Sequence, residues 1–140
     1  MIKQCQNDNN VFLEILDKLK EVKNCKITPN ILYTYMISEA IDKSAMTLVS
    51  YDNDKMNGCV VVKIIRDDFG ELSFIMTFIW VDAHFPHLMQ EFIDFGNNKA
   101  KELNIKKIMF ATSRKENIII RRMGKFGFKK IYSTYAKEVV

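Results

Sequence analysis

The C-terminal stretch Thr112–Val140 constrains the fold of this chain more than any other part of the sequence. Its pattern predicts a loop, a basic amphipathic helix over 118–126, a tight turn at Gly127-Phe128 and a closing strand over 129–139. Glycine commonly ends a helix because it adopts the left-handed conformation without steric cost. A helix that leads directly into a strand is typical of α/β proteins, so the rest of the chain has to supply the sheet.

Three apolar segments in the middle of the chain are the predicted strands of this sheet. Residues 46–51, 59–66 and 71–81 are rich in β-branched and aromatic residues, and polar turns separate them at 52–58 and 67–70. β-Branched residues favour strands over helices. Consecutive strands with short connections pair antiparallel, so these segments predict a meander.

Helical segments flank the meander. A short strand is expected over 1–6, followed by a helix that Asp8 or Asn9 caps. Thr28-Pro29 predicts the start of a second helix that ends near Lys43, because proline is favoured at the first helical position. The inward residues expected for these two helices are Phe12, Ile15, Leu16, Leu19 and Val22, then Leu32, Tyr33, Met36, Ile37 and Ala40.

Pro86 predicts a further helix to Leu103, followed by a strand over 105–113. Its expected inward residues are Leu88, Met89, Phe92, Ile93, Ala100 and Leu103. A strand reached through one crossover helix lies parallel to a neighbour. The expected order is therefore β-α-α-β-β-β-α-β-α-β, a single mixed α/β domain over 1–140 with helices on both faces of the sheet.

Composition narrows the class of protein. Nearly half of the residues are hydrophobic, at 48%, no apolar run approaches the roughly 20 residues of a membrane span, and the N-terminus lacks the pattern of a signal peptide. Cys5, Cys25 and Cys59 are odd in number and widely spaced, which indicates free thiols. A cytoplasmic, non-secreted protein is expected.

The net charge of +4 is unevenly distributed. Residues 101–130 contain ten Lys/Arg and two Glu, which gives +8 and leaves −4 for the remainder. A basic segment of this kind serves phosphate, nucleic acid or an acidic partner, or it is an ordinary solvated surface.

The order of elements, the basic last helix and Gly127-Phe128-Lys129-Lys130 together resemble the GNAT superfamily of acyl-CoA N-acyltransferases. The resemblance spans essentially the whole chain and is most specific from Glu71 to Val140. It implies a sheet that splays between the fourth and fifth strands, acetyl-CoA as cosubstrate without a metal, and direct attack of an amine on the thioester.

Carried over by position, the resemblance implies that Phe78, Ile79, Trp80 and Val81 line the slot for the pantetheine arm. The pyrophosphate loop falls on residues 82–89. There His84 replaces the family's Gln or Arg, and His87 and Met89 replace its two glycines, with Leu88 between them. Side chains at these positions keep the backbone further from a phosphate, and Pro86 removes one N–H donor.

The resemblance also implies anion contacts and catalytic groups in the C-terminal third. Arg114, Arg121 and Arg122 are the expected phosphate contacts, and Asn117 stands near the start of the last helix, where the family often has Asn. The family's tyrosine, four residues before Gly127, is replaced by Met123. Tyr132 or Tyr135 is then the candidate acid, and His84 the candidate base.

The two histidines with Asp82 do not make a metal site, because no further cysteine or carboxylate cluster completes the ligand set. Two functions remain open. One is an N-acetyltransferase acting on a small-molecule or protein amine. The other is a catalytically inactive GNAT-like protein that binds a protein or nucleic acid through residues 101–130. Compact proteins of this kind resemble ones found in phage genomes, which implies a virion as the alternative location.

Overall fold

The computed structural model describes residues 2–5, 9–22, 27–66, 69–110, 116–131 and 135–139. The elements in chain order are β1 (Ile2–Cys5), α1 (Asn9–Leu19), α2 (Pro29–Ile41), β2 (Ala45–Asp52), β3 (Lys55–Arg66), β4 (Leu72–Val81), α3 (Leu88–Glu102), β5 (Lys107–Met109), α4 (Glu116–Met123) and a 3-10 turn (Gly124–Phe126). None of the described helices combines the length and the hydropathy needed to cross a bilayer.

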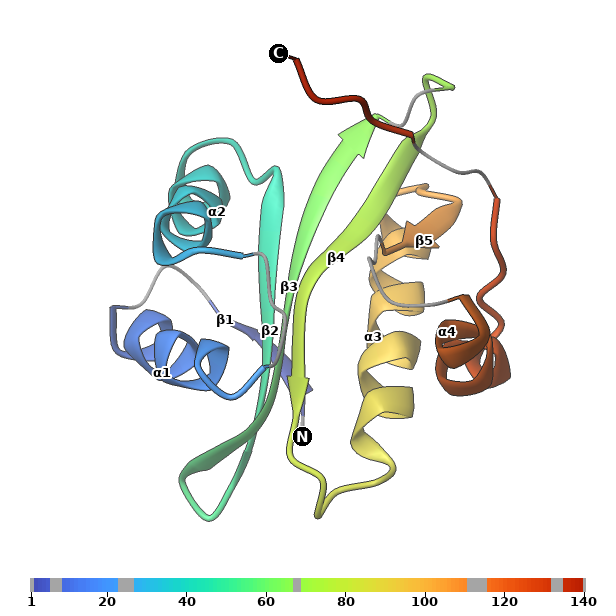
Figure 1. Ribbon diagram of the computed structural model, residues 1–140. Coiled ribbons are helices and arrows are strands. Elements are labelled where there is room, and N and C mark those ends of the chain that lie inside the picture. The colour runs from blue at the N-terminus through green and yellow to red at the C-terminus, as the bar shows by residue number, and fades with distance from the viewer. Residues whose placement is uncertain are drawn as a thin grey trace.

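The strands form one sheet in the order β1-β2-β3-β4-β5. The first four strands pair antiparallel, and β5 pairs parallel to β4. Helices α1 and α2 cover one face of the sheet, and α3 covers the other (Figure 1). This architecture confirms the predicted mixed α/β class, the meander and the parallel strand after the crossover helix.

Each face of the sheet carries its own hydrophobic core. Val49, Cys59 and Val61 face α1 and α2, whereas Val60 and Val62 face α3. Successive side chains of a strand point to opposite faces, so β3 contributes to both cores. This explains why its sequence is continuously apolar rather than alternating.

The turn between β2 and β3 is shorter than the sequence indicates. Asn53 and Asp54 have φ angles of 48° and 62°, as the two central residues of a tight hairpin turn require. The prediction of a polar turn over 52–58 was wrong, because β3 begins at Lys55 and Met56 is only 1% exposed. Polar residues around Met56 concealed the start of the strand.

Helix α2 begins as predicted, with the Thr28 hydroxyl accepting a hydrogen bond from the Ile31 N–H at 3.3 Å. Its inward face differs from the prediction, since Leu32 is buried but Tyr33 is 51% exposed and Ala40 is exposed. Apolar residues occur on every side of this helix, so periodicity does not single out one face. Leu103, expected inside at the end of α3, is also half exposed.

Helix α3 packs closely on β3 at Gly58. A Cβ atom at this position would lie 2.6 Å from Cε2 of Phe92 and 2.8 Å from Cδ2 of Leu88. Both residues belong to the first turns of α3 and are buried. Gly58 therefore determines how closely the N-terminal end of α3 approaches the sheet.

The C-terminal part contains a helix but no closing strand in its described residues. Gly127 has a φ of 91° and its N–H donates to the Gly124 carbonyl at 2.9 Å, which ends the helical segment as expected. The predicted strand over 129–139 was wrong for residues 129–131 and 135–139, which are exposed and form no strand of the sheet. Strand propensity alone does not form a strand without a neighbour, and β5 offers only three residues.

We expect Gly58→Ala to lower the free energy of unfolding by about 1–3 kcal/mol, the usual cost of forcing an extra methyl group into a packed core. Gly96→Ala in α3 is the matched control, because its Cβ would lie at an ordinary 3.6 Å from Ile108. Urea unfolding of the two variants checks this, and equal stability of both would contradict the close packing at Gly58.

Candidate functional site

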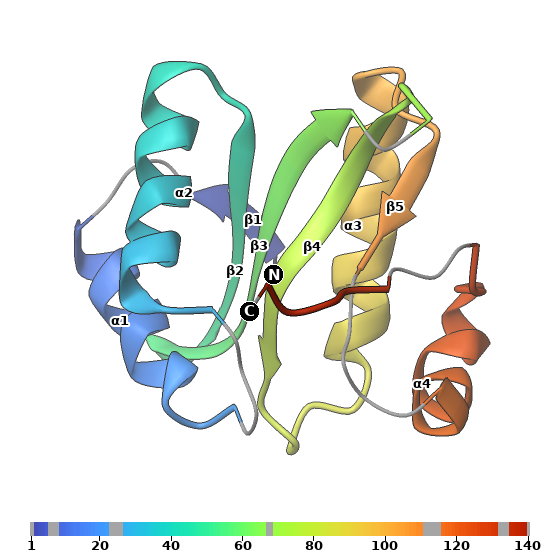
Figure 2. The same cartoon turned by 45° about the horizontal axis from the view of Figure 1, so that its top comes forward.

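Strand β4 separates from β5 halfway along its length. Only Ser73, Phe74 and Ile75 pair with β5. From Met76 to Val81, the edge of β4 that faces away from β3 has no strand partner among the described residues. Figure 2 shows β5 beside the first half of β4 only. Backbone groups along this free edge are available to a ligand that binds in an extended conformation.

A β-bulge at Thr77 marks the point of separation. Val61 of β3 pairs with Phe78, and Val62 pairs with Met76, so Thr77 is an extra residue in β4. The Thr77 hydroxyl donates to the Val61 carbonyl at 3.0 Å and satisfies a backbone acceptor at the bulge. A bulge increases local strand bending, which turns the second half of β4 away from the line of β5.

The bulge also decides where the predicted slot residues point. Phe78 is 3% exposed and belongs to the core under α1 and α2. Trp80 lies on the same face, partly buried, with Lys18 Nζ 4.6 Å from its ring centroid. Ile79 and Val81 pack on the α3 face. The four side chains therefore divide between both faces, and what they share is the free backbone edge.

The loop after β4 is organised by Asp82. Its carboxylate accepts the His84 backbone N–H at 2.9 Å and lies 2.8 Å from the His84 ring Nδ1. The backbone N–H of Asp82 donates to the Asn57 carbonyl at 2.9 Å, which ties the loop to β3. The two contacts with His84 lower the pKa of Asp82, with the hydrogen bond from the His84 backbone N–H as the largest cause. The His84 ring extends into solvent, with its side chain 90% exposed.

The first turn of α3 presents unused hydrogen-bond donors. His87 is the N-cap residue and its side chain makes no capping bond. Glu91 N–H donates to the His87 carbonyl, but no described group accepts from the backbone N–H of Met89 or Gln90. Such groups, with the positive end of the helix dipole, attract anions. Leu88 is 5% exposed and packs in the core, so its side chain is withdrawn from this site.

The structure does not bring together the remaining predicted site residues that it describes. Asn117, Arg121 and Arg122 are exposed on α4, and the Tyr135 side chain is 92% exposed. Arg114 and Tyr132 lie outside the described residues. Among the described residues, no group of three His, Cys, Asp or Glu side chains converges.

Sequence reasoning missed two determinants of this site, Thr77 and the contact between Asp82 and His84. An Asp two residues before His84, directly after a long strand, is typical of a side chain that caps a turn. That signal was available in the sequence. The bulge at Thr77 had no comparable signal, because a threonine in a strand is ordinary.

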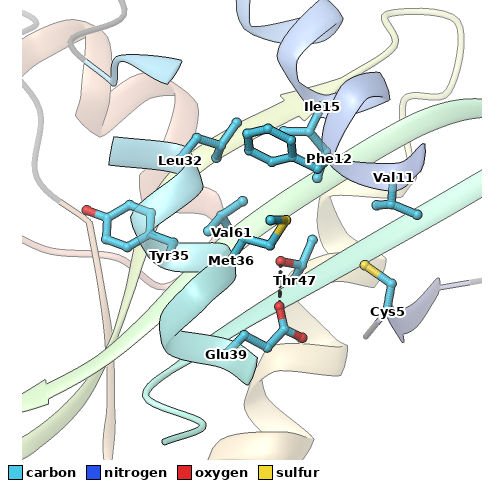
Figure 3. Close-up of a pocket in the computed structure, with 10 residues that line it drawn as sticks. All are labelled: Cys5, Val11, Phe12, Ile15, Leu32, Tyr35, Met36, Glu39, Thr47 and Val61. Carbon is cyan, nitrogen blue, oxygen red and sulfur yellow. Dashed lines mark hydrogen bonds between the residues drawn. The ribbon is translucent and has the colours of Figure 1, made fainter. Parts of the chain in front are cut away.

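A pocket lies between α1, α2 and the sheet, away from the free edge of β4 (Figure 3). Its walls are mainly apolar, but Glu39 of α2 reaches into it and accepts a hydrogen bond from the Thr47 hydroxyl at 3.1 Å. Burial raises the pKa of Glu39 above its ordinary 4.5, against the opposing effect of the bond from Thr47. Cys59, in the same core, is inert as a nucleophile because burial raises the pKa of its thiol to about 12.

Glu39 gives a prediction for the pH dependence of stability. Its raised pKa means that the folded protein retains a proton that the unfolded chain has lost, so its stabilising contribution is present below pH 4.5 and declines as pH rises through the folded pKa. We expect Glu39→Gln to unfold at higher temperature than the wild type at pH 7, with the difference vanishing below pH 4.5. Glu138→Gln, at an exposed position, is the control; identical midpoints for both variants at pH 7 would contradict the burial of Glu39.

Comparison with solved structures connects this geometry to known proteins. The structure of AAC(6')-Iy in complex with the bisubstrate analogue CoA-S-monomethyl-acetylneamine has a TM-score of 0.75 at 12% identity, with 99% of this chain and 98% of that chain covered. Ribosomal-protein-alanine N-acetyltransferase from Brucella melitensis biovar Abortus 2308 has a TM-score of 0.71 at 15% identity, with 99% of both chains covered. A transcriptional regulator from Bacillus halodurans C-125 has a TM-score of 0.73 at 13% identity, with 99% of both chains covered.

Comparisons with protein-family models and with curated proteins find no match. At these identities the likeness concerns the fold and not the substrate. It covers the whole chain, including the splayed β4 and the helix that follows. The chain therefore has the fold of the GNAT acyl-CoA N-acyltransferases.

Proposed function

We propose that this protein transfers an acetyl group from acetyl-CoA to a primary amine. The observation that carries the proposal is the free edge of β4 from Met76 to Val81, which leads directly to the unused N–H groups at the start of α3. In this fold, the free edge of β4 suits the amide groups of an extended pantetheine arm. The N–H groups at the start of α3 suit the pyrophosphate of the coenzyme. Bound acetyl-CoA would supply the thioester carbonyl, where an amine forms the C–N bond while the C–S bond breaks.

The backbone of the candidate site fits acetyl-CoA better than its side chains do. Met89 and Gln90 offer two N–H donors, and the His84 ring, held through Nδ1 by Asp82, is exposed to a ligand. Pro86 offers no donor, and Glu91 places a carboxylate in the first turn of α3. This balance favours the backbone edge of β4 as the principal binding element, with weaker retention of the phosphates than glycines would allow.

His84 serves better as a phosphate contact than as a general base in this proposal. It precedes α3 and its ring is turned to solvent. Arg121 and Arg122 remain the proposed contacts for the outer phosphates, and Tyr132 or Tyr135 the proposed acid. The acceptor class, whether small molecule or protein, is open. The AAC(6')-Iy complex shows an amine-derived bisubstrate analogue in this fold and supports an amine in general.

Calorimetric titration with acetyl-CoA, coenzyme A and ADP tests the proposal. We expect micromolar binding of the first two ligands, much weaker binding of ADP, and a loss of affinity in Arg121→Ala and Arg122→Ala. Release of free thiol from acetyl-CoA in the presence of a panel of amines then measures transfer. Absence of heat at millimolar acetyl-CoA, or binding without transfer to any amine, would contradict the enzyme function.

Glu91 gives a sharper test of the phosphate position. A carboxylate in the first helical turn repels an anion bound there, so we expect Glu91→Gln to bind acetyl-CoA about 2- to 5-fold more tightly, equivalent to roughly 0.3–1 kcal/mol. Asp94→Asn, one turn further along α3, is the matched control and should change the affinity by less than about 2-fold. Equal effects of both substitutions would place the phosphates elsewhere.

The second candidate is a GNAT-like protein without catalysis, in which residues 101–130 bind a protein or nucleic acid, inside a virion if the chain is phage-encoded. The observation that favours it is the occupation of the phosphate loop by His87 and Met89 where the family has glycines. The Bacillus halodurans structure described as a transcriptional regulator supports a role outside small-molecule acetylation for this fold.

A further inference from the structure

A groove at the opposite end of α3 has an unusual polar lining. It lies between the last turns of α3 and the start of β5, over an apolar floor. Its polar side chains are three lysines and two asparagines: Lys101, Lys106, Lys107, Asn97 and Asn104. Asparagine amides and lysine ammonium groups are all hydrogen-bond donors, so the groove is suited to an acceptor-rich anion.

Carboxylates near the groove neutralise only part of its charge. Lys107 Nζ lies 3.1 Å from the Glu71 carboxylate, and Glu102 is engaged by Lys99 at 3.3 Å. Lys101 and Lys106 are exposed and form no ion pair with any described residue. One lysine near a helix C-terminus is explained by the helix dipole. The helix dipole does not explain Lys106, which lies outside α3, next to the start of β5.

This groove cannot serve the pyrophosphate proposed for the start of α3. Helix α3 has 15 residues, so at a rise of 1.5 Å per residue its two ends lie about 22 Å apart. Figure 1 shows α3 beginning beside the end of β4 and finishing beside β5. An anion bound by Lys101 and Lys106 is therefore not the pyrophosphate that is proposed for the start of α3.

Further basic residues continue the groove along the same side of the molecule. The rings of Phe110 and Phe128 meet edge to face with centroids 5.1 Å apart, which holds the segment after Gly127 against the chain leaving β5. Lys129 and Lys130 follow directly and are exposed. Helix α4 carries two further basic residues, Arg121 and Arg122, which are both exposed. An extended ligand with repeating negative charges matches such a series.

Between the two macromolecular polyanions, the lining favours nucleic acid over an acidic protein. Protein interfaces are depleted in lysine and enriched in aromatic side chains at their centres. The groove has the reverse composition, with lysine and asparagine and no aromatic residue in its lining. Lysine and asparagine are common donors to phosphate and sugar oxygens.

We propose that the groove lined by Asn97, Lys101, Asn104, Lys106 and Lys107 binds the sugar–phosphate backbone of a nucleic acid without reading its sequence. Lys129 and Lys130 extend the contact toward α4. This site is independent of acetyl transfer and holds whether or not the enzyme function does.

Fluorescence anisotropy with labelled 20-nucleotide single strands and duplexes tests the proposal, at several salt concentrations between 50 and 200 mM. We expect micromolar binding to at least one of them at 50 mM salt. The double variant Lys101→Glu/Lys106→Glu should bind at least about 10-fold more weakly. The slope of log K against log salt should fall by about 1.4–1.8, as expected when two phosphate contacts are lost.

The matched control is Lys20→Glu/Lys43→Glu, which makes the same change in net charge at two exposed lysines outside the groove. It should retain wild-type affinity to within about 3-fold. Equal losses in both double variants, no binding by the wild type, or equally tight binding of polyglutamate would overturn the proposal. Circular dichroism and thermal midpoints verify folding, and unchanged acetyl-CoA affinity of both variants separates this site from the proposed active site.

Discussion

The pairing of β3 with β4, and the single bulge within it, is the constraint on which the rest of this structure depends. Before the bulge, Phe74 and Met76 of β4 face α3; after Thr77, Phe78 faces α1 and α2. The extra residue therefore reverses the alternation of β4, so that even-numbered residues face α3 before the bulge and face α1 and α2 after it. The bond from the Thr77 hydroxyl to Val61 keeps the cost low, because a buried backbone acceptor is not left unsatisfied.

The same bulge connects packing with the candidate site. Strand β4 bends where β5 stops pairing with it, and its free edge then leads to the loop of Asp82 and the first turn of α3. That turn is positioned by the close contact between α3 and Gly58. The three residues of β5 pair only with the first half of β4, so the second half leaves its backbone edge to a ligand among the described residues.

The charged residues of α3 are acidic near its N-terminus and basic near its C-terminus, so the two ends of the helix differ in how strongly they attract anions. Glu91 and Asp94 stand in its first half, while Lys99 and Lys101 stand in its last turns. This arrangement complements the helix dipole and stabilises α3. It also weakens the N-terminal end as an anion site and strengthens the C-terminal end as a cationic surface, so Glu91 stabilises the helix but disfavours an anion at its N-terminus.

Local patterns were sufficient for most of the secondary structure. Thr28-Pro29 began α2 as expected, Gly127 ended the last helical segment, and the β-branched runs formed β2, β3 and β4. Each of these signals acts within one element, through backbone conformation or a neighbouring side chain. The order of these elements was also enough to predict the GNAT-like fold.

Tertiary structure decided what depends on partners distant in the chain. Residues 129–139 have strand propensity, yet their described part pairs with no strand. Tyr33 was expected inside and lies outside, because α2 is apolar on all sides and the sheet selects its face. The bulge at Thr77 and the division of Phe78, Ile79, Trp80 and Val81 between the two faces of the sheet followed from packing alone. The sequence by itself thus determined most of the elements and their order, because each depends on neighbouring residues, and the tertiary structure decided which strand edges and which charges remained free.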